Sequence, residues 1–361
     1  MVGIAVEAQS KIYNKNKKQE KSMISIIIPH HLEDKEKIKP LMISMDQQIG
    51  IDFNSIEIIL CCDLEQSPLD DYNFEEYTNI SSRIKKIKSP YKQNPGMSRQ
   101  TALDICLGEY VLFCDADDSL YNMGVLRELL ENIEHSHADV YRFKFLEEIG
   151  SKNSASRSYN IKVHNWTWVF AQAYRVSFLR ENNVRFSPSL RWHEDTYFNL
   201  ILRYCNPDVV DINSIAYLWR YSDNSITRID DHSYTFLSLD EFLEATSQGF
   251  RVVQNVYNKN CLPDILTVSV RAYLALNNDS FLNRFGKEDI ERVERRYYEY
   301  VKEFLPTAFF PFLPQELDKM FTQIFFKVGQ FIPKIGWHDY LLKIESKYID
   351  FVGDNYKTTT Q

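Results

Sequence analysis

The residues with the clearest capacity for chemistry form the acidic segment Asp115-Ala116-Asp117-Asp118, directly after the apolar run 110–114. Three carboxylates so close together repel one another unless a cation or water screens them. Asp115 and Asp117 occupy alternate positions and can converge on one Mg²⁺ or Mn²⁺, ions that prefer oxygen ligands and share them with phosphates. We therefore predict a metal site at this pair, with solvent-facing carboxylates as the weaker alternative. Asp118 is expected to cap the following helix.

A second candidate is Arg99, in the segment 94–102 with the sequence Asn-Pro-Gly-Met-Ser-Arg-Gln-Thr-Ala. Asn-Pro-Gly is a loop signal and the apolar spacing after it predicts a helix, which places Arg99 in the first turns. There a planar guanidinium could bind a diphosphate, helped by the helix N-terminus. A surface arginine paired with Asp104 or another carboxylate fits equally well, and the segment alone leaves both interpretations open.

These side chains need elements that bring them together, and the first part of the chain alternates strands with helices. Short apolar runs predict strands at 23–29, 56–62, 83–88 and 110–114. Helical spacing predicts helices over 34–48, 97–107 and 120–134. Such alternation indicates parallel strands with right-handed crossovers. Because ligands bind at the carboxyl ends of such strands, we expect Pro29, Asp63 and Asp115 to face one crevice.

The pattern changes after residue 136. Further strands are predicted at 140–145, 166–174 and 209–220, and a helix at 194–204. From about residue 233 the chain is mainly helical, with prolines at 306, 311, 314 and 333 expected to break any long helix. We divide the chain into a flexible basic tail (1–22), a catalytic domain (23–230) and a mainly helical C-terminal domain (231–361).

The C-terminal domain carries no recognisable chemical motif. Its segment 304–344 combines Phe, Leu and Ile with scattered lysines, which suits either a helical subdomain that packs on the catalytic domain or on another subunit, or an amphipathic surface against a membrane. We favour the interpretation that this subdomain packs on protein, which includes another subunit of an oligomer.

Composition sets further bounds. Of the 361 residues 44% are hydrophobic and 25% charged, as in an ordinary folded protein. The net charge of −8 disfavours a nucleic-acid binder, which needs a basic footprint. The six cysteines lack metal-site spacing, which indicates buried thiols. No run reaches the ~20 apolar residues of a membrane span. We therefore expect a cytoplasmic protein, either free in the cytoplasm or peripheral at the inner face of the cell membrane.

In this order the motifs resemble those of the family 2 glycosyltransferases. The resemblance covers about residues 22–228. It is carried by Ile24-Ser25-Ile26-Ile27-Ile28-Pro29, Glu57-Ile58-Ile59-Leu60, Asn94-x-Gly96-x-Ser98-Arg99-Gln100 and Gly108-Glu109-Tyr110-x-x-Phe113-x-Asp115-Ala116-Asp117-Asp118. It implies an α/β protein with the GT-A (Rossmann-like) fold, a mixed sheet with flanking helices, here followed by a mainly helical C-terminal subdomain.

The resemblance also implies an activity. Such an enzyme moves a sugar from a nucleotide-diphospho-sugar, here expected to be a UDP-sugar, to a hydroxyl of a glycan, wall polymer or lipid-linked acceptor. The anomeric configuration is inverted and Mn²⁺ or Mg²⁺ is the cofactor. Pro29 would lie by the nucleobase, Asp63 would meet the base, and Asp115 and Asp117 would handle the ribose and the metal–diphosphate group. Arg99 joins this set as a donor contact.

The sequence departs from the usual family pattern at three places. Pro-Thr-Tyr-Asn is replaced by Pro-His-His-Leu at 29–32, and Asp-Asp-Gly-Ser by Cys-Asp-Leu-Glu at 62–65. Arg-Asn is replaced by Arg-Gln at 99–100. The second change removes a carboxylate near the base, which leaves the nucleotide open. His30 and His31 fit either a cleft or a structural role.

A second acidic pair, Glu194 and Asp195, opens the predicted helix at 194–204 and follows Trp192 and His193. The resemblance makes Asp195 the base that takes the acceptor hydroxyl proton, with Glu194 supporting the site. Trp192 and His193 are candidate acceptor contacts, Trp192 by stacking on a sugar. The alternative is that both acids merely stabilise the helix N-terminus.

Further along, the segment 217–227 resembles the family's closing segment over the donor diphosphate. Arg220 and Ser225 are its candidate phosphate contacts, with Arg228 as a substitute. Two rival functions stay open: a non-catalytic nucleotide- or carbohydrate-binding protein with this fold, and a transferase that glycosylates a protein or a modified nucleic acid.

Overall fold

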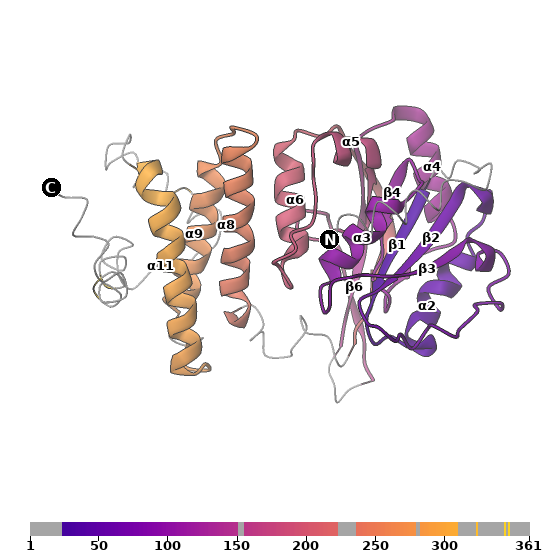
Figure 1. Ribbon diagram of the computed structural model, residues 1–361, viewed down its shortest axis with the longest axis horizontal. Coiled ribbons are helices and arrows are strands. Elements are labelled where there is room, and N and C mark those ends of the chain that lie inside the picture. Colours follow the sequence, from indigo (N-terminus) through magenta and orange to yellow (C-terminus); the bar gives the residue numbers. More distant parts are fainter. Residues whose placement is uncertain are drawn as a thin grey trace. The chain divides into compact units, whose positions relative to one another are not determined.

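The computed structural model describes residues 24–150, 155–222, 236–278 and 282–309, together with residues 323, 343 and 346. The chain divides into two compact units, Met1–Ser225 and Ile226–Gln361. In its described part the first unit forms a nine-stranded sheet flanked by helices (Figure 1). The basic tail expected at 1–22 and the boundary expected near residue 230 lie outside these ranges.

One half of the sheet is parallel, as the sequence predicts. Its strands are β1 (Ile24–His30), β2 (Ile56–Cys62), β3 (Ile84–Lys88) and β4 (Tyr110–Phe113), in the order β3-β2-β1-β4. They are connected through α2 (Lys35–Asp46), two short 3₁₀ turns (Phe53–Ser55 and Ser81–Arg83) and α3 (Pro95–Ile105). Every residue of β1, β2 and β4 is buried. These strands are mainly apolar because helices and loops cover both of their faces.

The other half is mixed, because β4 pairs antiparallel with β8 (Gln172–Arg175). The order continues β8-β6-β9-β5, and β7 pairs with β6. The bounds are β5 (Ser119–Leu120), β6 (Val140–Ile149), β7 (Ser158–Lys162) and β9 (Val209–Trp219). The mixed sheet confirms the expected fold class. The strand predicted over 166–174 is largely a loop, and the short β5 and the exposed β7 were not predicted.

Helices α4 (Val125–Ser136), α5 (Val176–Glu181) and α6 (Glu194–Tyr204) complete the unit. The helix predicted from residue 120 begins only at Val125, since Ser119 and Leu120 pair with β9 and Gly124 is the N-cap. The prediction of a helix at 194–204 is confirmed, whereas the short α5 was missed.

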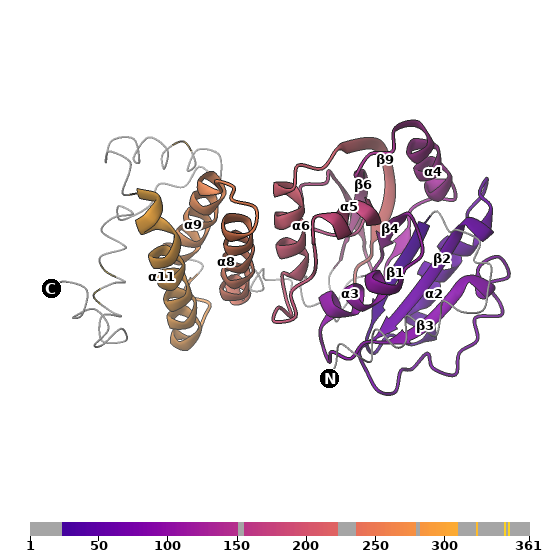
Figure 2. The ribbon, with the colours of Figure 1, turned by 45° about the horizontal axis from the view of Figure 1, so that its top comes forward.

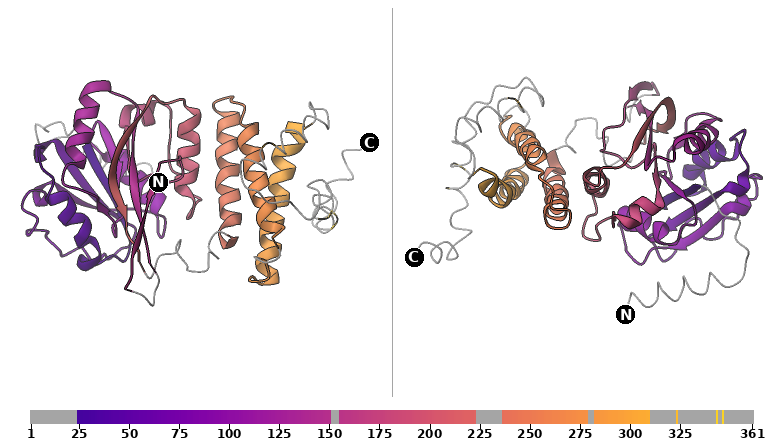
Figure 3. Two further views of the ribbon diagram at one scale, coloured as in Figure 1. Left: turned by 180° about the vertical axis from the view of Figure 1, so that it is seen from behind. Right: turned by 90° about the horizontal axis from the view of Figure 1, so that it is seen from above.

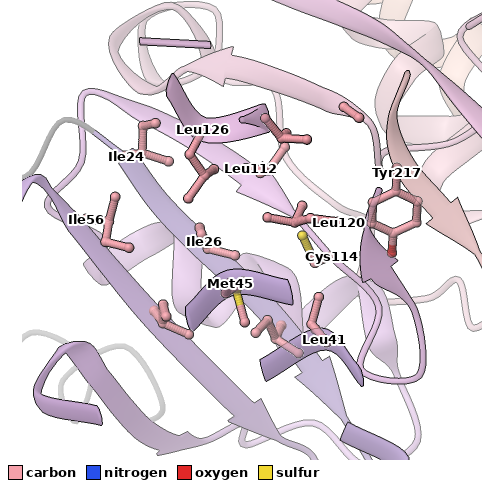
Figure 4. Packing of buried hydrophobic residues seen from close by; sticks show 14 of the residues in the cluster. Ile24, Ile26, Leu41, Met45, Ile56, Leu112, Cys114, Leu120, Leu126 and Tyr217 are labelled. Atoms are coloured by element: carbon pink, nitrogen blue, oxygen red, sulfur yellow. The ribbon is translucent and has the colours of Figure 1, made fainter. Parts of the chain in front are cut away.

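Two cores flank the sheet. On one face, β1 packs against α2 and α4 through residues that include Ile26, Leu41, Met45 and Leu126 (Figure 4). Helices α3, α5 and α6 cover the opposite face (Figure 2). There Phe113 of β4 meets Phe198 of α6 edge-on, with ring centroids 6.1 Å apart. The site helices α3 and α6 are therefore anchored on one face.

The described part of the second unit is helical, with α8 (Leu239–Asn255), α9 (Leu262–Leu276) and α11 (Lys287–Phe309) packed side by side (Figure 3). The Tyr300 hydroxyl donates to the carbonyl of Ile265 at 2.9 Å, which ties α11 to α9. Helix α11 continues through Pro306, contrary to the expected break. No helix in the described ranges is long and apolar enough to cross a membrane. Most of the segment 304–344 lies beyond them.

Candidate active site

The carboxyl ends of β1, β2 and β4 lie side by side. Pro29 is in register with Cys61 of β2, and the Asp63 N–H donates to the carbonyl of His30 at 3.4 Å. On the other side of β1, the Cys114 N–H donates to the carbonyl of Ile27 at 3.0 Å. The parallel pairing therefore places Pro29, Asp63 and Asp115 at one edge of the sheet.

At the β2 end, Asp63 is buried and both of its oxygens have partners. Oδ1 contacts Nδ1 of His31, and Oδ2 accepts from the Asn94 N–H at 3.1 Å. His30 is also buried, and this burial lowers its pKa. The two histidines therefore differ in their surroundings. His31 contacts Asp63, the carboxylate expected to meet the nucleobase, whereas His30 is buried in the interior.

Arg99 is almost fully buried and joins two acidic elements. Its Nη2 donates to Asp115 Oδ1 at 2.6 Å and its Nη1 donates to Glu194 Oε1 at 2.7 Å. Asp115 follows β4, whereas Glu194 is the first residue of α6. The sequence left the carboxylate partner of Arg99 open. The structure gives Arg99 two partners, Asp115 and Glu194, whereas Asp104 accepts from Gln100 at 2.8 Å.

The start of α3 is shaped to receive Glu194. Asn94 is the N-cap, its side chain accepting from the Met97 N–H at 2.9 Å, and Pro95 occupies the first turn. A Cβ added at Gly96 would lie 2.8 Å from Glu194 Cγ, below normal van der Waals contact. The loop signal and glycine of this motif thus allow α6 to approach α3.

Asp118 does not cap a helix, contrary to expectation. It is buried, and its oxygens accept from the Tyr217 hydroxyl at 2.7 Å and the Arg220 N–H at 2.8 Å. The Tyr217 hydroxyl in turn accepts from the Asp115 N–H at 2.9 Å. Burial and the adjacent Asp117 raise the pKa of Asp118 well above its ordinary value. Asp118 thus ties the end of β9 to the acidic strand end, a link between residues too far apart in sequence to predict.

Asp115 and Asp117 are half-buried beyond the end of β4. Burial, Asp115 and Glu33 raise the pKa of Asp117 to about 6. The negatively charged form of this carboxylate is therefore destabilised, and a bound cation would stabilise it. Within the described ranges no group of three or more His, Cys, Asp or Glu side chains is arranged to hold a metal ion. Two carboxylates still suit Mn²⁺ or Mg²⁺, which often bind through one or two carboxylates and take remaining ligands from phosphates and water.

Asp195 follows Glu194 in the first turn of α6. It is half-buried, and burial together with Glu194 raises its pKa to about 8. His193 precedes the helix in the left-handed conformation, with φ of 57°, and turns the chain into α6. The Trp192 side chain is exposed. A carboxyl group whose pKa lies near neutrality is suited to proton transfer.

Arg220 directly follows β9. Its backbone is fixed by Asp118, and it is half-buried. Ser225 and Arg228 lie outside the described residues. The structure therefore brings together the strand-end acids, Arg99 and the Glu194–Asp195 pair, and fixes the backbone at Arg220.

The first unit is similar to a known protein family. Residues 25–199 match the family described as glycosyl transferase family 2. EpsJ of Bacillus subtilis (strain 168), described as an uncharacterized glycosyltransferase, is 24% identical over 256 residues, which are 65% of this chain and 70% of EpsJ.

Among solved structures, S. aureus TarS 1–349 in complex with UDP is similar with a TM-score of 0.59. The match covers 91% of this chain and 92% of the TarS chain at 16% identity, a likeness of fold. Residues 25–199 thus form a glycosyl transferase family 2 domain, and the chain has the GT-A fold and is a glycosyltransferase.

Proposed function

We propose that this enzyme transfers a sugar from a UDP-sugar to a hydroxyl of a glycan, wall polymer or lipid-linked acceptor, with inversion at the anomeric carbon. The observation that carries the proposal is the shared guanidinium of Arg99, which contacts Asp115 and Glu194 from two distant elements. One site then holds the acids for the donor and those for the acceptor. The UDP bound by the structurally similar TarS supports the choice of nucleotide.

On the donor side, Pro29 and Asp63 would bind the base, and Asp115 the ribose. Asp115 and Asp117 would hold Mn²⁺ or Mg²⁺, whose positive charge stabilises the departing diphosphate. Arg220 and Ser225 would contact the diphosphate from the segment after β9.

On the acceptor side, the hydroxyl oxygen attacks the anomeric carbon as the bond from that carbon to the diphosphate oxygen breaks. Asp195 accepts the hydroxyl proton, and the nucleoside diphosphate leaves with the bonding electron pair. The raised pKa of Asp195 makes its carboxylate a stronger base than an ordinary aspartate. Trp192 and His193, just before α6, would contact the acceptor. With a lipid-linked acceptor the transfer takes place at a membrane surface.

The test is nucleotide release from UDP-, GDP- and dTDP-sugars with Mn²⁺. The native chain is compared with Asp117→Ala and Asp195→Asn. Asp211→Asn is the matched control, because Asp211 is the third residue of β9, at the end of the strand away from Arg220, and pairs with Arg142 at 2.6 Å. We expect turnover of UDP-sugars, loss of turnover in both site variants and retention in the control.

Two other results would contradict parts of this proposal. If no donor binds in the presence of Mn²⁺, the assignment of Asp115 and Asp117 is wrong. If donor binds but no acceptor or water takes the sugar in a broad screen of glycans, lipids, proteins and nucleic acids, the protein is a binding module and not a transferase.

A further inference from the structure

The guanidinium of Arg99 has little left to offer a ligand. Its side chain is 7% exposed, and each terminal nitrogen already donates to a carboxylate within 2.7 Å. Its Nε is buried and has no hydrogen-bond acceptor in the described part of the chain. Because the guanidinium is buried between Asp115 and Glu194, a donor diphosphate could reach this fork only if side chains around it moved.

We infer that Arg99 is a positioning residue that holds the donor side and the acceptor side of the site in one geometry, and not the diphosphate ligand that the sequence suggests. The inference rests on the proposed function, since it assigns Asp115 to the donor and Glu194 to the acceptor side. Arg99 acts through these two carboxylates, and through Glu194 on the adjacent Asp195.

An arginine is needed for this task because of its shape. The planar guanidinium presents two terminal nitrogens to two carboxylates at once, whereas a lysine ammonium is a compact point charge on a flexible stem. The partners lie 16 and 95 residues away in sequence, on the β4 end and on the first residue of α6. Gly96, one turn before Arg99, leaves room for Glu194 to reach the fork.

Charge gives a second reason. Asp115, Asp117, Glu194 and Asp195 would repel one another in a partly buried site without a cation between them. Arg99 lies between Asp115 and Glu194 and offsets one of their two negative charges. This arrangement leaves Asp117, together with Asp115, for the metal ion and Asp195 for the acceptor proton.

The test separates positioning from ligand binding with Arg99→Lys, Glu194→Gln and the double variant. Two quantities are measured for each: the dissociation constants of UDP and uridine with and without Mn²⁺, by calorimetry, and the turnover of the donor identified for the native enzyme. Arg175→Lys is the matched control, because Arg175 forks onto Asp139 outside the site.

We expect Arg99→Lys to lower turnover by at least about tenfold, since misplacement of a catalytic group by about 1 Å can cost about 100-fold. Without Mn²⁺, the ratio of UDP affinity to uridine affinity should change by less than about threefold. Glu194→Gln should lower turnover to a similar extent. Because both changes break the same contact, the double variant should be no slower than the slower single variant by more than about threefold. Arg175→Lys should turn over donor at the native rate.

Three results would overturn the inference. One is a loss of UDP affinity of about tenfold or more in Arg99→Lys without Mn²⁺ and with uridine affinity unchanged, the sign of a lost diphosphate contact. Another is a double variant whose loss of turnover equals the product of the losses in Arg99→Lys and Glu194→Gln. If Arg99→Lys fails to fold, native turnover in Glu194→Gln is the third. A native enzyme that neither binds nor turns over any donor instead refutes the proposed function, and the inference falls with it.

Discussion

Substitution of Gly96 by alanine tests how tightly α3 and α6 are packed at the site. The added Cβ would lie 2.8 Å from Cγ and 2.9 Å from Cβ of Glu194, and 3.3 Å from Cδ1 of Phe186. Carbon atoms in contact are normally about 3.5–4.0 Å apart, so Glu194 must move by about 0.7 Å or more. Its Cβ is bonded directly to the backbone, which means that the first turn of α6 moves too.

Two consequences differ in size. Overpacking costs about 1–3 kcal/mol, and the higher helix propensity of alanine returns up to about 1 kcal/mol. The free energy of unfolding should therefore fall by no more than about 3 kcal/mol. A shift of about 0.7 Å carries Asp195 with it and should lower turnover by about 10- to 100-fold.

The assay pairs donor turnover with urea unfolding for native enzyme, Gly96→Ala and Gly286→Ala. The last is the control, because a Cβ at Gly286 would meet nothing closer than 3.7 Å. A folded Gly96→Ala enzyme with native turnover would refute the argument that the position of Glu194 against α3 sets the rate.

Three further results are expected. Burial and Asp115 raise the pKa of Asp117 to about 6, so protons should compete with the metal ion below that pH. Calorimetry should therefore show that the Mn²⁺-dependent affinity for UDP falls from about pH 7 to about pH 5. An affinity that does not change over this range would contradict the prediction. Since the pKa of Asp195 is raised to about 8 when folded and is about 4 when unfolded, native enzyme should lose stability relative to Asp195→Asn as pH rises between these values. Urea unfolding at about pH 5 and pH 9 measures this gap, which should widen at the higher pH. Gly108→Ala should lower the free energy of unfolding by about 3 kcal/mol in the same assay, because its Cβ would lie 2.5 Å from the backbone nitrogen of Ser25; a native value would show that β1 and β4 can separate at no cost.

The sequence predicts the parallel half of the sheet well because its strands carry a strong local signal. The apolar runs of β1, β2 and β4 leave no polar face, a pattern typical of strands covered on both sides. The missed elements lack such a signal: β7 is exposed along most of its length, β5 has two residues and α5 has six.

The site follows the same division. The acidic residues were found because they lie next to strong elements, Asp115 after β4 and Glu194 at the start of α6. The roles of Arg99 and Asp118 depend on partners 95 and 99 residues away, which no local pattern reveals. Local propensity made Asp118 a helix cap, whereas the structure makes it the buried partner of Tyr217.

The most direct test of the account is proton NMR of a UDP-sugar turning over with Mn²⁺ and water as the acceptor. One spectrum series identifies the nucleotide released and the anomer of the sugar as it first appears. A single displacement assisted by Asp195 predicts release of UDP and, from an α-linked donor, the β-anomer first, with neither formed by Asp195→Asn. Initial formation of the α-anomer, or native turnover in Asp195→Asn, would contradict the proposed mechanism.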